Sequence, residues 1–232
     1  MDIAPNGQYT FNLIGHLDHG NPNAPNEALF LNFGITARDA DGDTATGSIR
    51  VTVRDDAPSV ENATLRVDET VVDNAGSDTE SGSLAVDFGL DDGGTIEASG
   101  ANTFVAGGSL LNGALTSNGV AIVVALVGTQ YVGTANGATV FTLDINNNGQ
   151  YTFDLVGTLD HADGTNPNDV INLQFGVTVT DKDGDTDDAI ITVLVNDDGP
   201  VAVDDVLNVA SGQTSASGNV LANDDALSLI HI

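Results

Sequence analysis

The sequence predicts an all-β protein, an antiparallel β-sandwich built as tandem repeats. Many short segments alternate apolar and polar residues, which is typical of half-buried antiparallel strands. Turn residues of the Gly, Asn and Asp types separate these segments at short intervals, as they do in sandwiches. No segment has the 3.6-residue periodicity that would predict an amphipathic helix. Together these observations favour two packed sheets.

The chain contains an internal repeat. Residues 2–58 align with residues 144–200 at a constant offset of 142, without a gap and with 30 identities in 57 positions. The motifs NGQYTF, LDH, DGDT and DD-x-P occur once in each copy. We therefore expect one complete repeat at 58–199, and residues 1–57 to be the C-terminal part of a truncated copy. Residues 200–232 would begin a further module, with a possible non-native tail after residue 227.

The strands can be predicted in order from these patterns. In the first copy they cover residues 8–14, 28–38 and 47–54; in the second, 150–156, 171–179 and 191–195. Asn148-Gly149 predicts a hairpin that joins residues 139–145 to 150–156. Earlier strands are expected at 64–68, 83–90, 109–116 and 120–127. The last of these is the longest apolar run, which is typical of a buried strand and too short to cross a membrane.

The truncated copy lacks roughly half of its sandwich. Its three strands would form at most a small sheet with one apolar face uncovered, and such sheets are marginally stable alone. Because Met1 falls within a repeat, we expect the chain to be a piece of a longer tandem protein.

The charge of the chain excludes several classes of partner. Its 232 residues carry 34 acidic and 5 basic side chains, a net charge of −29. Nucleic acids and anionic lipids need a basic surface, so neither is expected as a partner. The chain has no cysteine, which excludes disulfides, thiolate zinc sites and thiol nucleophiles. Clustered carboxylates repel unless something neutralises them, and five basic residues are too few, so metal cations are expected.

The pattern D-x-D-G-D-T places three carboxylates at alternate positions in each copy. These are Asp39, Asp41 and Asp43 in the first copy and Asp181, Asp183 and Asp185 in the second. A plain hairpin turn is the alternative, but a turn needs only one Asp and one Gly. Alternate spacing lets several oxygens converge on one ion, and Ca²⁺ binds six to eight oxygens with irregular geometry. The pattern therefore favours calcium.

A second acidic pair closes each copy. It comprises Asp55 and Asp56 in the first copy, and Asp197 and Asp198 in the second. The alternative is a charged linker ended by proline, which blocks strand pairing. In a sandwich, however, the loop that enters the last strand lies at the pole where the preceding copy arrives. The DGD loop of one copy should therefore face the closing pair of the previous copy, with Asp68 and Glu69 close enough to join. A junction site is favoured over a self-contained loop.

The remaining candidates point away from catalysis. His19 and His161 recur in the LDH motif; one histidine beside a turn is more often structural than a metal ligand, and the sequence leaves both roles open. Asp91 and Asp92 are adjacent, so on an extended chain they point apart and do not form a glycosidase pair. No nucleophile elbow, HExxH or phosphate-binding loop is present. We therefore expect no enzymatic activity.

These motifs resemble a known family. The series NGQYTF, LDH, DxDGDT and DD-x-P, with V-D-E at residues 67–69, is similar to the tandem domains of very large type I-secreted bacterial adhesins of the RTX class. Related VCBS repeats share the hairpin and the DGD turn, and residues 202–225 resemble the start of another cadherin-like module. The resemblance covers residues 1–200 and implies an immunoglobulin- or cadherin-like sandwich.

The resemblance also implies a function. Such repeats act as extenders, forming a calcium-stiffened stalk on the outside of the cell that serves adhesion and biofilm formation. The implied partners are neighbouring repeats of the same polypeptide, while host, surface or matrix contacts belong to other domains. The implied calcium ligands are the carboxylates of Asp39, Asp41, Asp43, Asp55, Asp56, Glu69, Asp181, Asp183, Asp185, Asp197 and Asp198.

Two other functions stay open. The chain could be a carbohydrate- or protein-binding sandwich of the same kind of adhesin, or an accessory domain of a secreted hydrolase. Exposed aromatic side chains would favour the binding module, because sugars stack on aromatic faces. The chain has no tryptophan, and most of its aromatic residues fall on inward-facing positions. A catalytic role would need a cleft with convergent polar groups.

Overall fold

The computed structural model describes residues 1–15, 17, 27–69, 76–89, 93–162, 166, 168–198 and 204–219. Apart from two short 3-10 turns, η1 (Ala101–Thr103) and η2 (Leu111–Gly113), its secondary structure is β-strand, which confirms the all-β prediction. No helix in the described part is long and apolar enough to cross a membrane.

The chain divides into two compact units. The first comprises Met1–Val60, Ala85–Ile96 and Thr178–Asp188, and the second comprises Glu61–Leu84, Glu97–Val177 and Ala189–Ile232.

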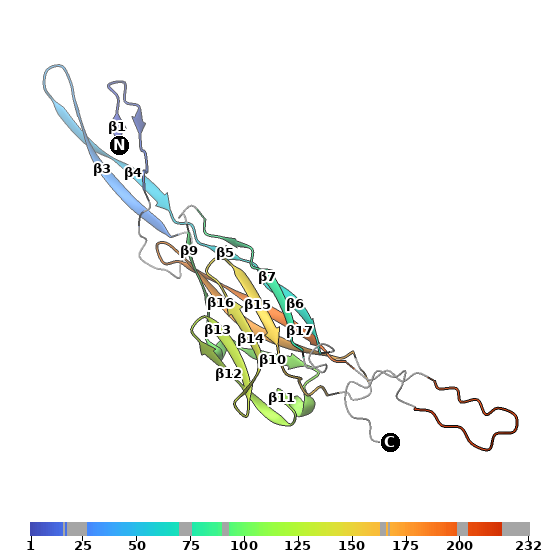
Figure 1. The fold of residues 1–232 in the computed structure, drawn as a ribbon. Coiled ribbons are helices and arrows are strands. Elements are labelled where there is room, and N and C mark those ends of the chain that lie inside the picture. The colour runs from blue at the N-terminus through green and yellow to red at the C-terminus, as the bar shows by residue number, and fades with distance from the viewer. Residues whose placement is uncertain are drawn as a thin grey trace. The chain divides into compact units, whose positions relative to one another are not determined.

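Two sheets, most of whose residues belong to the second unit, make up the sandwich (Figure 1). One has the order β11 (Thr116–Ser117), β12 (Val120–Val127), β13 (Gln130–Ala135), β14 (Ala138–Ile145), β15 (Gln150–Leu155) and β7 (Asp78–Ser83). The other has the order β10 (Val105–Gly108), β16 (Val170–Asp181), β17 (Thr186–Asn196) and β6 (Ala63–Asp68), and β9 (Gly94–Ala98) also pairs with β16. The β14–β15 hairpin confirms the prediction made from Asn148-Gly149.

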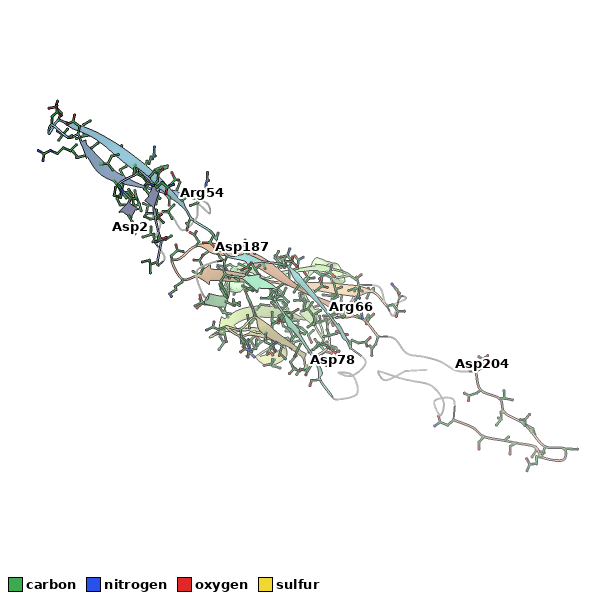
Figure 2. All side chains as sticks on the ribbon, turned by 90° about the horizontal axis from the view of Figure 1, so that it is seen from above. Asp2, Arg54, Arg66, Asp78, Asp187 and Asp204 are labelled. Carbon is green, nitrogen blue, oxygen red and sulfur yellow. The ribbon has the colours of Figure 1, made fainter. Side chains whose placement is uncertain are left out.

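Within the two sheets the strands form one parallel and several antiparallel pairs. The parallel pair is β17 with β6, the strand that carries Arg66 (Figure 2). Arg66 Nη1 donates to Asn196 Oδ1 at 3.2 Å. At the end of β6, the backbone N–H of Asp68 donates to Asp78 Oδ2 at 2.8 Å, which links this strand to the start of β7.

A cluster of aromatic rings holds the two sheets together. Phe175 on β16 is fully buried, and its ring centroid lies 5.3 Å from Tyr131, 5.9 Å from Phe141 and 6.1 Å from Phe153. Those three residues come from β13, β14 and β15 of the opposite sheet. Ring pairs at these separations add to the stabilisation from apolar burial. The predicted face-to-face sandwich is therefore confirmed.

The described residues of the first copy form no such core. In the first unit β1 (Asp2–Ile3) pairs with β2 (Tyr9–Thr10), β3 (Ala28–Arg38) with β4 (Thr44–Arg54), and β5 (Ser59–Val60) with β8 (Val86–Asp87). The strand expected at 8–14 is only two residues long. Phe33 occupies the repeat position of Phe175 but is half-buried, with one described ring contact, to Phe11 at 6.0 Å. The apolar face of β3 and β4 is thus partly open to solvent.

Two predicted strands are wrong. Residues 83–90 do not form one strand: β7 ends at Ser83, and β8 contains only Val86–Asp87. Residues 109–116 contain η2 instead, and β11 starts at Thr116. The sequence analysis also missed β7 before residue 83, β9, β10 and β13.

Packing explains the missed strands. β7 is an edge strand of polar residues, held by cross-strand side-chain bonds from Thr79 to Asp154 at 2.7 Å and between Ser81 and Thr152 at 3.0 Å. β13 buries Gly133, where an added Cβ would lie 2.5 Å from the Phe141 ring. Polar and small residues of this kind do not alternate with apolar ones along the sequence. The two segments are therefore recognisable as strands only from the strands that pair and pack with them.

The apolar run at 120–127 forms β12, but it is not the buried strand that the sequence predicts. Val123 is 66% exposed and Val127 is 63% exposed. β12 is second from the edge of its sheet, and the rings of the opposite sheet contact β13, β14 and β15 instead. Its apolar composition therefore reflects β-propensity more than burial.

We expect the β3–β4 hairpin to be the least protected part of the described strands. Its apolar face is half-exposed, whereas residues 139–196 include the fully buried core. Opening free energy follows local burial, so amides in 28–54 should exchange faster than those in 139–196. Hydrogen exchange on monomeric protein measures this, and equal protection would contradict it.

Matched substitutions test the same difference. Phe175→Ala should lower the free energy of unfolding of the second unit by about 3–5 kcal/mol, because it opens a cavity in a closed core. Phe33→Ala, at the same repeat position, should leave that transition unchanged. Denaturant unfolding followed by the near-ultraviolet signal of the buried rings measures both, and equal effects would show that the first copy shares the core.

Candidate functional site

The DGD loop of the second copy joins β16 to β17. Asp181 closes it: its backbone N–H donates to the carbonyl oxygen of Asp185 at 3.0 Å, and its Oδ1 accepts from the N–H groups of Gly184 at 3.0 Å and Asp185 at 2.8 Å. Gly184 has φ +110°, a conformation that L side chains rarely adopt. The turn therefore accounts for Asp181 and Gly184.

The first copy builds the same loop between β3 and β4. Asp39 Oδ1 accepts from Gly42 at 3.0 Å and from Asp43 at 2.8 Å, and Gly42 has φ +107°. Local sequence therefore determines the loop conformation in both copies. What differs is the burial. Asp39, Asp41 and Asp43 are exposed, although their oxygens lie within 4.8 Å of one another, whereas Asp181 and Asp185 are buried.

One acidic group combines residues from both copies. Asp55, Asp183 and Asp185 each offer a carboxylate oxygen, and these oxygens lie within 4.8 Å of one another. Asp55 is 6% exposed and Asp185 is 3% exposed. All three belong to the first unit. Asp55 follows β4, and its backbone N–H donates to the carbonyl oxygen of Glu27 at 2.9 Å, which fixes its position.

Burial changes the electrostatics of the loop. Burial, together with the neighbouring Asp183 carboxyl, raises the pKa of Asp181 to about 6. Asp181 Oδ2 is buried and has no hydrogen-bond partner. In the exposed copy, the hydrogen bond with Asp41 lowers the pKa of Asp39. The charged form of the carboxyl group is therefore disfavoured only in the buried loop, and a bound cation would offset this desolvation penalty.

Only one member of each closing pair joins an acidic group. Asp55 and Asp197 belong to such groups, whereas Asp56 and Asp198 do not in the part of the chain that the structure describes. Adjacent residues of an extended chain point to opposite sides, so one site does not use both side chains.

Glu69, His161 and Asp197 form a separate group in the second unit. One potential ligand atom of each lies within 4.8 Å of the others. Glu69 is 3% exposed, and its Oε1 accepts from the backbone N–H of Leu159 at 2.7 Å. His161 Nδ1 lies 2.6 Å from Asp169 Oδ1, and His161 Nε2 lies 3.7 Å from Glu69 Oε1. Glu69, which the sequence analysis grouped with the DGD loop, thus lies beside the histidine.

Each residue of the LDH motif makes a different contact. Leu159 is buried in the core. The two carboxylate oxygens of Asp160 accept from the N–H groups of Asn118 at 2.9 Å and Gly119 at 2.8 Å, which holds the turn between β11 and β12. His161 enters the buried group with Glu69. The motif therefore stabilises the β11–β12 turn and also contributes the imidazole of the buried group.

Burial and charge act against each other in this group. Burial raises the pKa of Glu69, although the nearby His161 ring lowers it in part. The pKa of Asp197 is also raised, mainly by burial. Burial lowers the pKa of His161, but the carboxylates of Glu69, Asp197 and Asp169 outweigh it and the pKa is raised overall.

The sequence analysis did not select Asp169. Its available signal was the repeat alignment, in which Glu27 and Asp169 occupy the same position and are both acidic. The backbone confirms the equivalence: the N–H of Asp197 donates to the carbonyl oxygen of Asp169 at 2.9 Å, as Asp55 does to Glu27. His19, Asp91 and Asp92 lie outside the described residues.

Comparison with known families gives one match. The family described as "Domain of unknown function (DUF5801)" matches residues 64–194, a segment that contains most of the second unit and the DGD loop. No curated protein matches the chain.

Proposed function

The chain belongs to the DUF5801 family, and we propose that it is a calcium-stabilised structural extender repeat of a large secreted or surface-anchored bacterial adhesin. The observation that carries this proposal is the group of Asp55, Asp183 and Asp185. It joins the end of one repeat to a loop of the next, with carboxylate oxygens within 4.8 Å. The proposed partners are the neighbouring repeats of the same polypeptide, outside the cell.

Calcium is the cation that best suits this group. The donors are carboxylate oxygens, which hard cations prefer, and Ca²⁺ accepts irregular shells completed by backbone oxygens or water. Mg²⁺ demands a near-octahedral shell and keeps more of its own water. A divalent cation would also neutralise charges that 5 basic residues cannot balance against 34 acidic ones.

An ion held by both copies would have a mechanical role. Asp55 lies on the segment that leaves the first copy, and Asp183 and Asp185 lie on a rigid loop of the second. A shared ion would restrict the joint between copies. Without it, the same carboxylates repel one another. Many such joints in series would give an adhesin stalk directed reach, which serves cell adhesion and biofilm formation.

A ligand-binding module is the main alternative. Among the described residues, the strongly exposed aromatic side chains are Tyr9 and Phe30, both in the first copy of the repeat. The exposed apolar residues of the complete sandwich are aliphatic, such as Val123 and Val127 on β12. Because carbohydrate sites use aromatic faces, this surface favours a structural role over carbohydrate recognition. We likewise propose no catalytic activity.

Calcium should raise the melting temperature of the chain. Ligand at 100-fold above its Kd stabilises the native state by about 2.7 kcal/mol, which is about 5–10 °C for a protein of this size. Circular dichroism melts in calcium and in excess chelator measure the shift, and magnesium should restore only part of it. Identical melts in calcium and chelator would refute the proposal.

Changing Asp183→Ala and Asp185→Ala together should loosen the joint between the copies. In calcium, small-angle scattering of the full chain should change from the profile of a fixed arrangement to that of a flexible one. In calcium, the melting temperature of this variant should fall by no more than the shift that calcium gives the unaltered chain, because the substitutions remove ligands of the ion and no apolar residue of the core.

The matched control is Asp41→Ala with Asp43→Ala in the exposed loop. It removes the equivalent aspartates from a loop of the same conformation. The acidic group of that loop does not include Asp55. Scattering of this control should equal that of the unaltered chain. If the first pair lowers the melting temperature while leaving the scattering unchanged, the ion is an internal staple of the loop and the junction proposal is wrong.

A further inference from the structure

The calcium proposal leaves a buried histidine unexplained. His161 has a side chain that is 4% exposed, in a chain with only 4 histidines. It is surrounded by the carboxylates of Glu69, Asp169 and Asp197. A packed hydrophobic residue would fill this space without the cost of desolvating charges. Apolar packing alone therefore does not explain why these charged groups are buried together.

The Asp169 contact determines which nitrogen is available. At 2.6 Å, a carboxylate beside Nδ1 accepts the proton of that nitrogen. This tautomer leaves the Nε2 lone pair directed away from Asp169. A histidine that binds a metal through one nitrogen usually donates the other N–H to a carboxylate, which orients the ring and raises its basicity. Asp169 is placed for that role.

Nε2 lacks a hydrogen-bond partner. It is buried, and Glu69 Oε1 lies 3.7 Å away, beyond the 2.7–3.2 Å range of an N–H···O bond. One ring nitrogen of His161 and one carboxylate oxygen from each of Glu69 and Asp197 lie within 4.8 Å of one another. Two ligands about 2.0–2.2 Å from one tetrahedral zinc lie roughly 3.3–3.6 Å apart, and the 3.7 Å between Nε2 and Glu69 Oε1 is close to that separation.

The negative charges around the imidazole also favour a bound cation. Three carboxylates around one neutral imidazole carry three negative charges in a largely buried space, and protonation of the ring would offset only one. A divalent cation offsets two and leaves the ring neutral, which is the form that binds metal.

We propose that His161 Nε2, Glu69 and Asp197 form a binding site for a borderline divalent metal of the Zn²⁺ type, with Asp169 as the positioning residue. The nitrogen donor separates this site from the DGD loops. Ca²⁺ and Mg²⁺ take oxygen ligands, whereas imidazole with carboxylates suits Zn²⁺. The chain would then hold two kinds of ion, calcium at a site with only oxygen ligands and zinc at a site with nitrogen and oxygen ligands.

Zinc titration of the full chain tests the site. The starting protein carries His16→Gln, His19→Gln and His231→Gln, so that His161 is its one remaining histidine. After chelation and dialysis into excess calcium, calorimetry with zinc chloride should give one site per chain. His161→Gln should weaken it at least tenfold, and Asp169→Asn by about 10–100-fold. Asp183→Ala with Asp185→Ala should leave zinc affinity unchanged.

A nitrogen-15 spectrum of the ring gives a readout that a purely structural role would not move. On zinc addition the Nε2 resonance should shift to the value of a metal-bound nitrogen, while Nδ1 stays protonated. Amide spectra check that each variant is folded. If His161→Gln does not fold, Asp169→Asn and Asp197→Asn decide, since both keep the shape of the side chain.

Three results would overturn the proposal. The first is zinc affinity that is equal in the folded ligand variants and the starting protein, which would show binding elsewhere. The second is an unshifted Nε2 at saturating zinc, which would identify a buried ion pair. The third is the absence of any zinc site that survives excess calcium. The calcium proposal depends on Asp183 and Asp185, so either proposal can fail without the other.

Discussion

Packing of β16 and β17 into the sandwich is the constraint on which both acidic groups depend. The face of β16 that carries Phe175 is closed by rings from β13, β14 and β15, which fixes the hairpin in place. This hairpin begins just after Asp169 and ends just before Asp197, and its loop contains Asp183 and Asp185. One apolar core therefore holds carboxylates at both ends of the same hairpin.

The two copies of the repeat separate local from tertiary effects. Their DGD loops have the same hydrogen-bond pattern and nearly equal glycine φ angles, so the local sequence is enough to determine the loop conformation. Yet the pKa of Asp39 is lowered and that of Asp181 is raised. The difference comes from burial, because desolvation penalises the charged form whatever the loop conformation.

The two buried groups differ in donor chemistry. Asp55, Asp183 and Asp185 offer only oxygen, while the group of Glu69 and Asp197 includes an oriented imidazole. Under the two proposals, one ion would act on the joint between copies and the other would stabilise a copy from within. Both would supply positive charge to a chain that has very little of its own.

The sequence by itself determined the all-β class, the repeat with its offset of 142 residues, the β14–β15 hairpin and the DGD loops. These follow from local alternation and turn chemistry, which short stretches of chain encode. It also brought Asp55 together with Asp183 and Asp185, because repeat order and sandwich topology imply which ends face each other. It failed for β7 and β13, whose polar or small residues become strand only beside their neighbours.

Only the tertiary structure decided burial and partners. It left Val123 of the most apolar segment exposed, and it buried His161, for which the sequence left both a structural and a metal-binding role open. It also brought Glu69 to His161, 92 positions away in the numbering, and added Asp169 behind the ring. Burial and long-range contact depend on which faces of the two sheets meet. Periodicity along one strand says which residues share a face, but not what covers that face or what lies at the ends of the strand.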